Sequence, residues 1–233
     1  VVSYGFCFPA FCLILRGIAG SRPDVRAPLG PARFGQVLLI SIAGLYLANL
    51  LTQLLLDAVS SVRGRPVSDP LAALSAFPPI LTVLLTCLAA PIFEELLFRR
   101  LLLSRLLPYG DAFAVTVSAL AFGLFHGNFS QFFYAFALGW IFGYVVVRTG
   151  CLWQTILLHA LVNSISTCLL PLAPLHGTAA VSILGLVILA AILLGIVFAV
   201  VQRHSLTFFS GSTDLQEGEK WRVLLTSPGF LLF

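Results

Sequence analysis

Residues 89–100 read A-A-P-I-F-E-E-L-L-F-R-R and place two adjacent glutamates, Glu94 and Glu95, inside an apolar stretch. The whole chain has only nine acidic residues among 233. An ionisable side chain at bilayer depth costs from about 2.5 to 17 kcal/mol, and such side chains face a cavity or a charged partner. The two carboxylates are therefore the first candidates for function.

The composition around these glutamates is that of a membrane protein. Hydrophobic residues make up 59 % of the chain, charged residues only 9 %, and the mean hydropathy is +1.04. A soluble domain of this length would need far more charged surface. The sequence therefore predicts an all-α, polytopic integral membrane bundle that forms one domain over residues 1–201. Residues 202–233 are predicted to be a tail.

The apolar segments predict about 7–8 membrane helices. The predicted ranges are 4–19, 35–57, 72–90, 93–107, 112–127, 130–148, 151–170 and 178–201. A straight helix over 72–107 would overshoot a hydrocarbon core of about 30 Å at about 1.5 Å per residue. We therefore expect a break near Pro91 that starts a new helix carrying both glutamates.

Basic residues are distributed unevenly over alternate connections. One side of the membrane would carry eleven of them, whereas Arg63 and Arg65 lie on the other. The eleven are Arg16, Arg22, Arg26, Arg33, Arg99, Arg100, Arg105, Arg148, Arg203, Lys220 and Arg222. The positive-inside rule then predicts a multi-pass cell-membrane protein with a cytoplasmic tail and both glutamates near the cytoplasmic surface. The same asymmetry explains the net charge of +4 without a nucleic-acid partner.

Two further polar clusters interrupt apolar segments. One is F-G-L-F-H, which ends at His126, and the other is H-A-L-V-N, from His159 to Asn163. Residues four apart share a helix face, so His159 and Asn163 can address one ligand together. Asn128 is predicted to cap a helix. Gly139 and Gly143 are predicted to allow two helices to approach closely.

The same geometry separates the two glutamates. Glu95 and Arg99 are four residues apart and can pair on one helix face. Glu94 points about 100° away from that face. We therefore expect Glu95 and Arg99 to be a structural ion pair, and Glu94 to act as a base beside a histidine.

The three motifs E-E-x-x-x-R, F-x-x-x-H and H-x-x-x-N occur in this order within residues 88–165. This arrangement resembles the CPBP family, the CAAX-protease and bacteriocin-processing membrane proteins also called Abi. The resemblance implies an intramembrane endopeptidase whose eukaryotic and archaeal relatives trim the last three residues from prenylated CAAX proteins. It implies that Glu94 and His126 activate water and that His159 and Asn163 hold the oxyanion. The expected partners are the lipid bilayer and a membrane-associated peptide or protein substrate.

A metal ion is an open alternative in this interpretation. Glu94, His126 and His159 together would be a plausible zinc ligand set. The chain has no H-E-x-x-H motif, however, and an amide oxygen such as that of Asn163 is an uncommon zinc ligand. We therefore favour a reaction without metal or other cofactor.

The alternative function is non-catalytic. A bacteriocin-immunity or scaffold protein could keep the same fold, and a small ion- or proton-coupled transporter could use Glu94 and the histidines as a relay. A relay needs only ionisable groups. Asn163 on the face of His159 therefore favours the peptidase.

Overall fold

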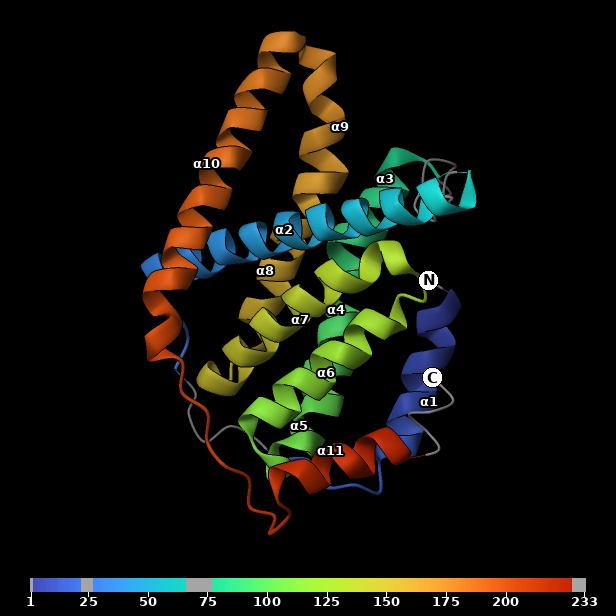
Figure 1. The fold of residues 1–233 in the computed structure, drawn as a ribbon, viewed down its shortest axis with the longest axis vertical. Helices are drawn as coiled ribbons and strands as arrows, with labels where there is room; N and C mark the ends of the chain where they lie inside the picture. Colours follow the sequence, from blue (N-terminus) through green and yellow to red (C-terminus); the bar gives the residue numbers. More distant parts are fainter. Residues whose placement is uncertain (1, 22–26, 66–76, 228–233) are drawn as a thin grey trace.

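The computed structural model describes residues 2–21, 27–65 and 77–227, and within them the chain is all-α (Figure 1). The separate helices are α1 (Val2–Leu15), α2 (Pro31–Arg63), α6 (Asp111–Phe125), α7 (Phe129–Thr149), α10 (Thr178–Gln202) and α11 (Glu217–Thr226). Two longer helices, Pro79–Tyr109 and Leu152–His176, are each composed of several joined segments.

Among the described residues, five helices are long and apolar enough to cross a membrane. They are α2, Pro79–Tyr109, α7, Leu152–His176 and the region Thr178–Ser205 that contains α10. The helix α6 is apolar but has only 15 residues. The predicted class, an all-α polytopic membrane bundle, is confirmed. The number of helices long enough to span the membrane is smaller than the predicted 7–8. Two of the predicted segments join into one helix, and two others are too short.

The joined segments are those on either side of Pro91. The helix Pro79–Tyr109 comprises α3 (Pro79–Val83), η2 (Leu84–Ala89), α4 (Ala90–Glu95), η3 (Leu96–Leu103), α5 (Ser104–Leu106) and η4 (Leu107–Tyr109). Residues 72–76 of the predicted range lie outside the described residues.

The predicted break at Pro91 is wrong, although the winding of the helix changes there. Ala89 and Ala90 both have helical backbone angles. The π-helical segment η2 ends at Ala89, just before Pro91. In π-helical turns each N–H bonds to the carbonyl five residues earlier instead of four. This shifted hydrogen-bond pattern lets the helix accommodate Pro91, which has no N–H. Both glutamates follow on α4, with a second π-helical segment, η3, beyond them.

The helices α6 and α7 pack closely. A Cβ atom at Gly139 would lie 3.1 Å from the Cα of Ala119, and one at Gly143 would lie 3.3 Å from the side chain of Val115. The prediction that these two glycines allow close helix approach is confirmed. Their small size also brings the backbone of α7 within reach of side chains on η3.

The helix α2 crosses the bundle obliquely and packs against both α7 and α10 (Figure 1). Leu45 of α2 joins Leu138 and Phe142 of α7 and Leu158 of the segment α8 (Leu152–Ser164) in one buried cluster. The remaining segments of that helix are η5 (Ile165–Leu169), α9 (Leu170–Leu172) and η6 (Ala173–His176). This cluster fixes α8, which carries two of the candidate site residues, against α7.

The described part of the tail returns to the bundle. Asp111 and Phe209 form two hydrogen bonds: the N–H of Asp111 donates to the carbonyl of Phe209, and the N–H of Phe209 donates to the side-chain carboxylate of Asp111. Arg148 pairs with that same carboxylate. Beyond the turn η7 (Arg203–Ser205), α11 packs Trp221 against Phe113 of α6. The tail therefore holds together the ends of α6 and α7.

Candidate active site

Four ionisable side chains meet where the middle of Pro79–Tyr109 faces α8. Glu94 and Glu95 come from α4, Arg99 from η3 and His159 from α8, and all four are buried. Glu94 has fifteen residues of its helix on either side. That the glutamates lie near the cytoplasmic surface stays a prediction, although Arg99, which was counted among the surface charges, is buried.

Arg99 is the buried partner of Glu95, as the spacing predicted. Its Nε lies 3.3 Å from Oε2 of Glu95, and neither side chain has any exposed surface. Its Nη2 donates to the carbonyl of Gly139 at 3.2 Å, and its guanidinium lies 4.6 Å from the centre of the Phe122 ring. The close approach of α7 to α6 thus supplies part of the arginine's environment.

His159 lies between the two glutamates. Its Nδ1 is 3.1 Å from Oε1 of Glu95, and its Nε2 is 3.6 Å from Oε2 of Glu94. Each ring nitrogen of His159 therefore faces one carboxylate, and Glu95 also faces Arg99, so both buried carboxylates have a basic side chain beside them.

His126 follows the last residue of α6 and lies beside this cluster. Its Nδ1 is 2.8 Å from the carbonyl of Phe122. A carbonyl only accepts, so Nδ1 carries a proton and Nε2 is left as the acceptor of a neutral ring. The Phe122 ring touches both imidazoles, with ring centres 5.0 Å from His126 and 5.9 Å from His159. Phe122 therefore spaces the two histidines.

Asn163 lies one turn beyond His159 on α8. Its Nδ2 donates to the carbonyl of Thr86 at 2.8 Å. This bond uses one of the two amide N–H groups and fixes the orientation of the side chain. Thr86 belongs to the π-helical segment η2, so the irregular turns before Pro91 help to position a candidate site residue.

The predicted N-cap at Asn128 is present. Its Oδ1 accepts the N–H of Gln131 at 2.9 Å, and its Nδ2 donates to the carbonyl of His126 at 2.8 Å. Gln131 in turn donates to the hydroxyl of Tyr134, whose ring lies 6.3 Å from that of His126. A short polar network therefore holds the turn that carries His126.

The sequence motifs missed three contributors to this site. Thr155 is a buried neighbour of Glu95, and its hydroxyl donates to the Leu152 carbonyl at 2.9 Å. The ring of Phe142 lies 5.6 Å from that of His159, and the Gly139 carbonyl binds Arg99. Thr155 is four residues before His159, so its spacing could have identified it. The other two come from α7, and only tertiary packing brings them in.

The zinc alternative involves Glu94, His126 and His159. Within the described part of the chain, no group of three or more His, Cys, Asp or Glu side chains is placed to hold a metal ion. Nδ1 of His159 faces Glu95 and Nδ1 of His126 faces a backbone carbonyl, so Nε2 is the ring nitrogen that each histidine could offer to a ligand or a water molecule. The reaction without a metal stays a prediction.

Comparison with known proteins agrees with the motif order. Residues 76–165 match the family model described as type II CAAX prenyl endopeptidase Rce1-like. The putative membrane peptidase YdiL of Bacillus subtilis (strain 168) is 26 % identical over 170 residues, which cover 70 % of this chain and 68 % of the relative. No solved structure matches the chain.

The matched region contains all of the buried ionisable cluster. It begins just before the helix that carries Glu94, Glu95 and Arg99, and it ends just after Asn163. Over this region the chain is similar to the Rce1-like type II CAAX prenyl endopeptidases, and both comparisons support a membrane peptidase of the CPBP kind.

Proposed function

We propose that the protein hydrolyses a peptide bond of a membrane-associated peptide or protein, with Glu94 and His126 activating the attacking water. In the same proposal His159 and Asn163 stabilise the oxyanion of the tetrahedral intermediate. The observation that carries this assignment is the position of His159 between the two glutamates, with Glu95 held by Arg99.

This geometry supports different roles for the two carboxylates. The side chain of Glu94 keeps 7 % of its surface exposed, whereas that of Glu95 keeps none. Glu95 fixes the imidazole of His159 from the Nδ1 side, as a third group orients the histidine in other hydrolases. Glu95 and Arg99 are therefore positioning residues, and Glu94 is the carboxylate assigned to the water.

His126 is suited to assist that carboxylate. Its Nδ1 proton is bound to the Phe122 carbonyl, which leaves Nε2 as the acceptor. Its ring is half-buried and borders the same phenylalanine as His159. A histidine whose tautomer is fixed by a backbone carbonyl can take a proton from water and later return it to the leaving amine.

The oxyanion donors would come from α8. The second amide N–H of Asn163 is not used by its bond to Thr86 and is directed by that bond. An oriented donor of this kind is typically worth about 3–4 kcal/mol of transition-state stabilisation. An amide cannot relay a proton as a carboxylate can, so this feature favours a peptidase over an ion-coupled transporter. A scaffold protein would need none of this alignment.

The proposed substrate is a lipidated peptide or a leader peptide in the membrane. Phe93, directly before Glu94, is 38 % exposed, and its ring lies 5.7 Å from that of Phe8 on α1. The exposed surface directly beside Glu94 is thus apolar, which supports a lipidated or hydrophobic substrate.

We also propose that the tail lies in the cytoplasm. Arg99 must be removed from the count of surface charges because it is buried against Glu95. Ten basic residues then remain on one side of the membrane and two on the other. The asymmetry that orients the chain is unchanged.

Replacing His126 by alanine tests the proposed base. We expect His126→Ala to lower the rate of cleavage about 10²- to 10⁴-fold, because a positioned proton acceptor is lost. The measurement is cleavage, in reconstituted membranes, of a prenylated C-terminal peptide or a membrane-anchored leader peptide that the wild type cleaves. His176→Ala changes an exposed histidine outside the site and should leave the rate unchanged. Equal rates for the two variants would contradict the role of His126.

Removal of metal ions tests the proposed reaction from another direction. We expect wild-type cleavage to persist after dialysis against a strong chelator, because the proposed activation of water uses Glu94 and His126 without a metal ion. Metal analysis of the purified protein should find far less than one zinc per chain. Loss of cleavage on chelation that returns specifically with zinc would show that the metal-free assignment is wrong.

A further inference from the structure

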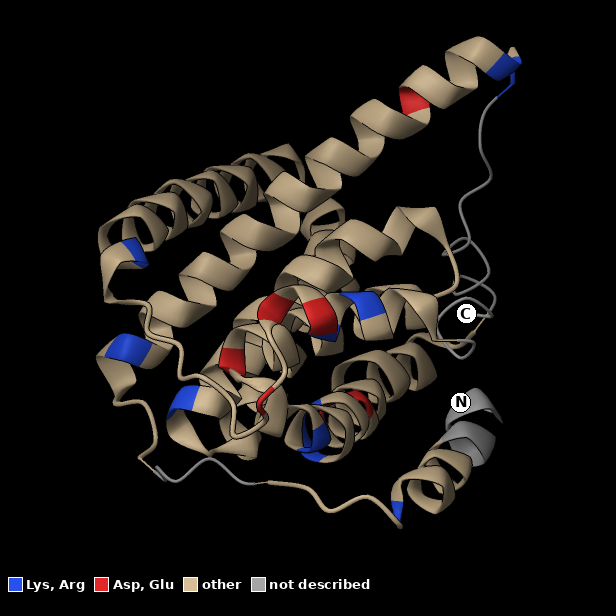
Figure 2. Ribbon diagram, turned by 60° about the horizontal axis from the view of Figure 1, so that its bottom comes forward, with Lys and Arg blue, Asp and Glu red and all other residues tan. Residues whose placement is uncertain are grey.

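We propose that the protein binds the phosphate of an anionic phospholipid in a pocket at the start of α2, the end of α7 and the end of α10. Two adjoining cavities of about 700 Å³ and 520 Å³ form this pocket, and Arg33 and Arg148 line both. Figure 2 shows Lys and Arg positions gathered at the side of the molecule where α10 ends and α2 begins. The proposal is independent of the peptidase chemistry at Glu94.

The charge of the pocket is suited to an anion. Among the described residues, no aspartate or glutamate lines either cavity. Arg148 is held in place by Asp111 on one side and by Thr207, to which Nη1 donates at 3.2 Å. Its Nε is buried without a partner in the described structure, and the side chain of Arg33 is exposed. Guanidinium groups bind phosphate oxygens through two parallel hydrogen bonds, so a phosphate matches both arginines.

The first turn of α2 adds to this charge. Gly30 to Arg33 line the smaller cavity, and no side chain caps the helix. The first N–H groups of a helix have no partner within it, and they form the positive end of its dipole. They reinforce the two arginines, which carry the assignment.

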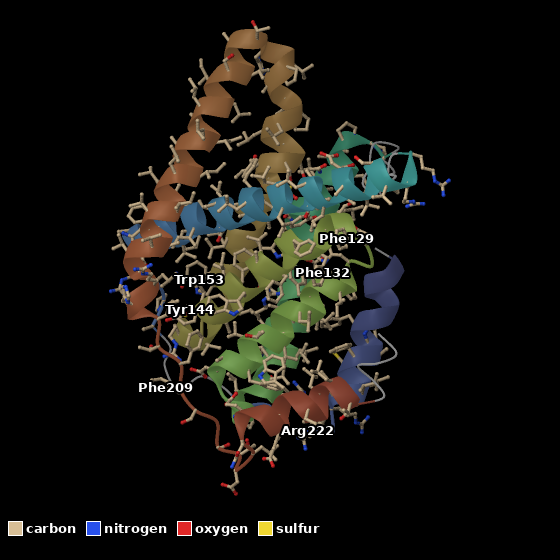
Figure 3. The ribbon with its side chains drawn as sticks, viewed as in Figure 1. Phe129, Phe132, Tyr144, Trp153, Phe209 and Arg222 are labelled. Carbon is tan, nitrogen blue, oxygen red and sulfur yellow. The ribbon has the colours of Figure 1, made fainter. Side chains whose placement is uncertain are left out.

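The remaining walls are apolar and favour a lipid over a free anion. Val37, Val145, Phe198 and Leu206 line the larger cavity, beside Tyr144 (Figure 3). The neighbouring surface of α10 exposes Val197, Val200 and Val201 by 54 %, 51 % and 70 %. A phospholipid places a phosphate against the arginines and acyl chains along α10, whereas a soluble phosphate leaves the apolar walls unused.

One wall of the pocket is fixed by a buried glutamine. The N–H of Leu29 donates to Oε1 of Gln154 at 2.8 Å, and Nε2 of Gln154 donates back to the Leu29 carbonyl at 3.0 Å. Gln154 is only 1 % exposed. It joins the loop before α2 to α8, so the pocket is preformed and a bound lipid would brace three helices together.

The experiment compares lipids on the purified full chain in detergent. Native mass spectrometry and thermal unfolding are measured with phosphatidylglycerol, phosphatidylcholine or inorganic phosphate. We expect phosphatidylglycerol to be retained and to raise Tm more than the other two. Arg33→Gln should weaken its retention about fivefold, since one basic side chain is lost from an anionic headgroup. Arg33→Lys should restore part of that loss.

Arg63→Gln is the matched control, because it removes an arginine from the opposite end of the same helix. It should retain phosphatidylglycerol as the wild type does. Equal retention by Arg33→Gln and the wild type would overturn the proposal. The same rise in Tm with inorganic phosphate as with phosphatidylglycerol would overturn the lipid assignment. Equal retention of phosphatidylcholine would overturn the role of charge.

Discussion

Glu94→Gln is expected to lower the rate of peptide cleavage about 10²- to 10⁴-fold while the protein stays folded. Glutamine has nearly the same shape as glutamate, but its amide cannot accept a proton from water. The side chain is slightly exposed and lies beside Nε2 of His159, so the cluster loses its base without losing volume. The measurement is the cleavage rate in reconstituted membranes, together with Tm in detergent.

Asp57→Asn serves as the matched control for this variant. Asp57 is an exposed carboxylate on α2, far along the chain from the buried cluster. The same loss of one carboxylate there should change neither the rate nor Tm. Cleavage at the wild-type rate by Glu94→Gln would remove Glu94 from the mechanism. A large fall in Tm would instead identify its role as structural.

Arg99→Met is expected to destabilise the fold by about 3–5 kcal/mol, because it removes the arginine that faces the buried charge of Glu95 and leaves only His159 beside it. Both side chains are fully buried, and the pair is 3.3 Å apart. The substitution also removes the hydrogen bond to Gly139 and the contact with the face of Phe122. Equilibrium unfolding in mixed micelles, followed by circular dichroism, measures this cost.

A double-mutant cycle with Glu95→Gln separates the ion pair from these other contacts. We expect the double variant to be destabilised by clearly less than the sum of the two single variants, because no charge is left unpaired. Arg100→Met is the control for loss of a neighbouring arginine, since Arg100 is exposed. If the losses of unfolding free energy in the two single variants add up to that of the double variant within about 0.5 kcal/mol, Glu95 and Arg99 are not coupled.

The local pairings in the site were predictable because they depend on helix periodicity. Glu95 and Arg99 are four residues apart, and so are His159 and Asn163. The first two do pair. The same rule would have identified Thr155, which precedes His159 by four residues. The cap at Asn128 and the close approach at Gly139 were predictable for the same reason, since each follows from the chemistry of one short segment.

The errors came from two residues whose sequence context is ambiguous. A proline inside an apolar stretch usually ends or kinks a helix, but at Pro91 the preceding π-helical turns absorb it. An arginine after an apolar stretch usually lies at the membrane surface, but Arg99 lies in the core because Glu95 offers it a charge there. Both outcomes depend on winding and burial, which a linear pattern does not record.

The sequence by itself determined the membrane class, the order of the three motifs and the pairing of Glu95 with Arg99. Each of these follows from composition or from contacts within one helix. Only the tertiary structure decided that His159 lies between both glutamates and that Asn163 binds Thr86. Those contacts join helices that are far apart in the chain, and they depend on how the bundle packs α8 against α4 and α7.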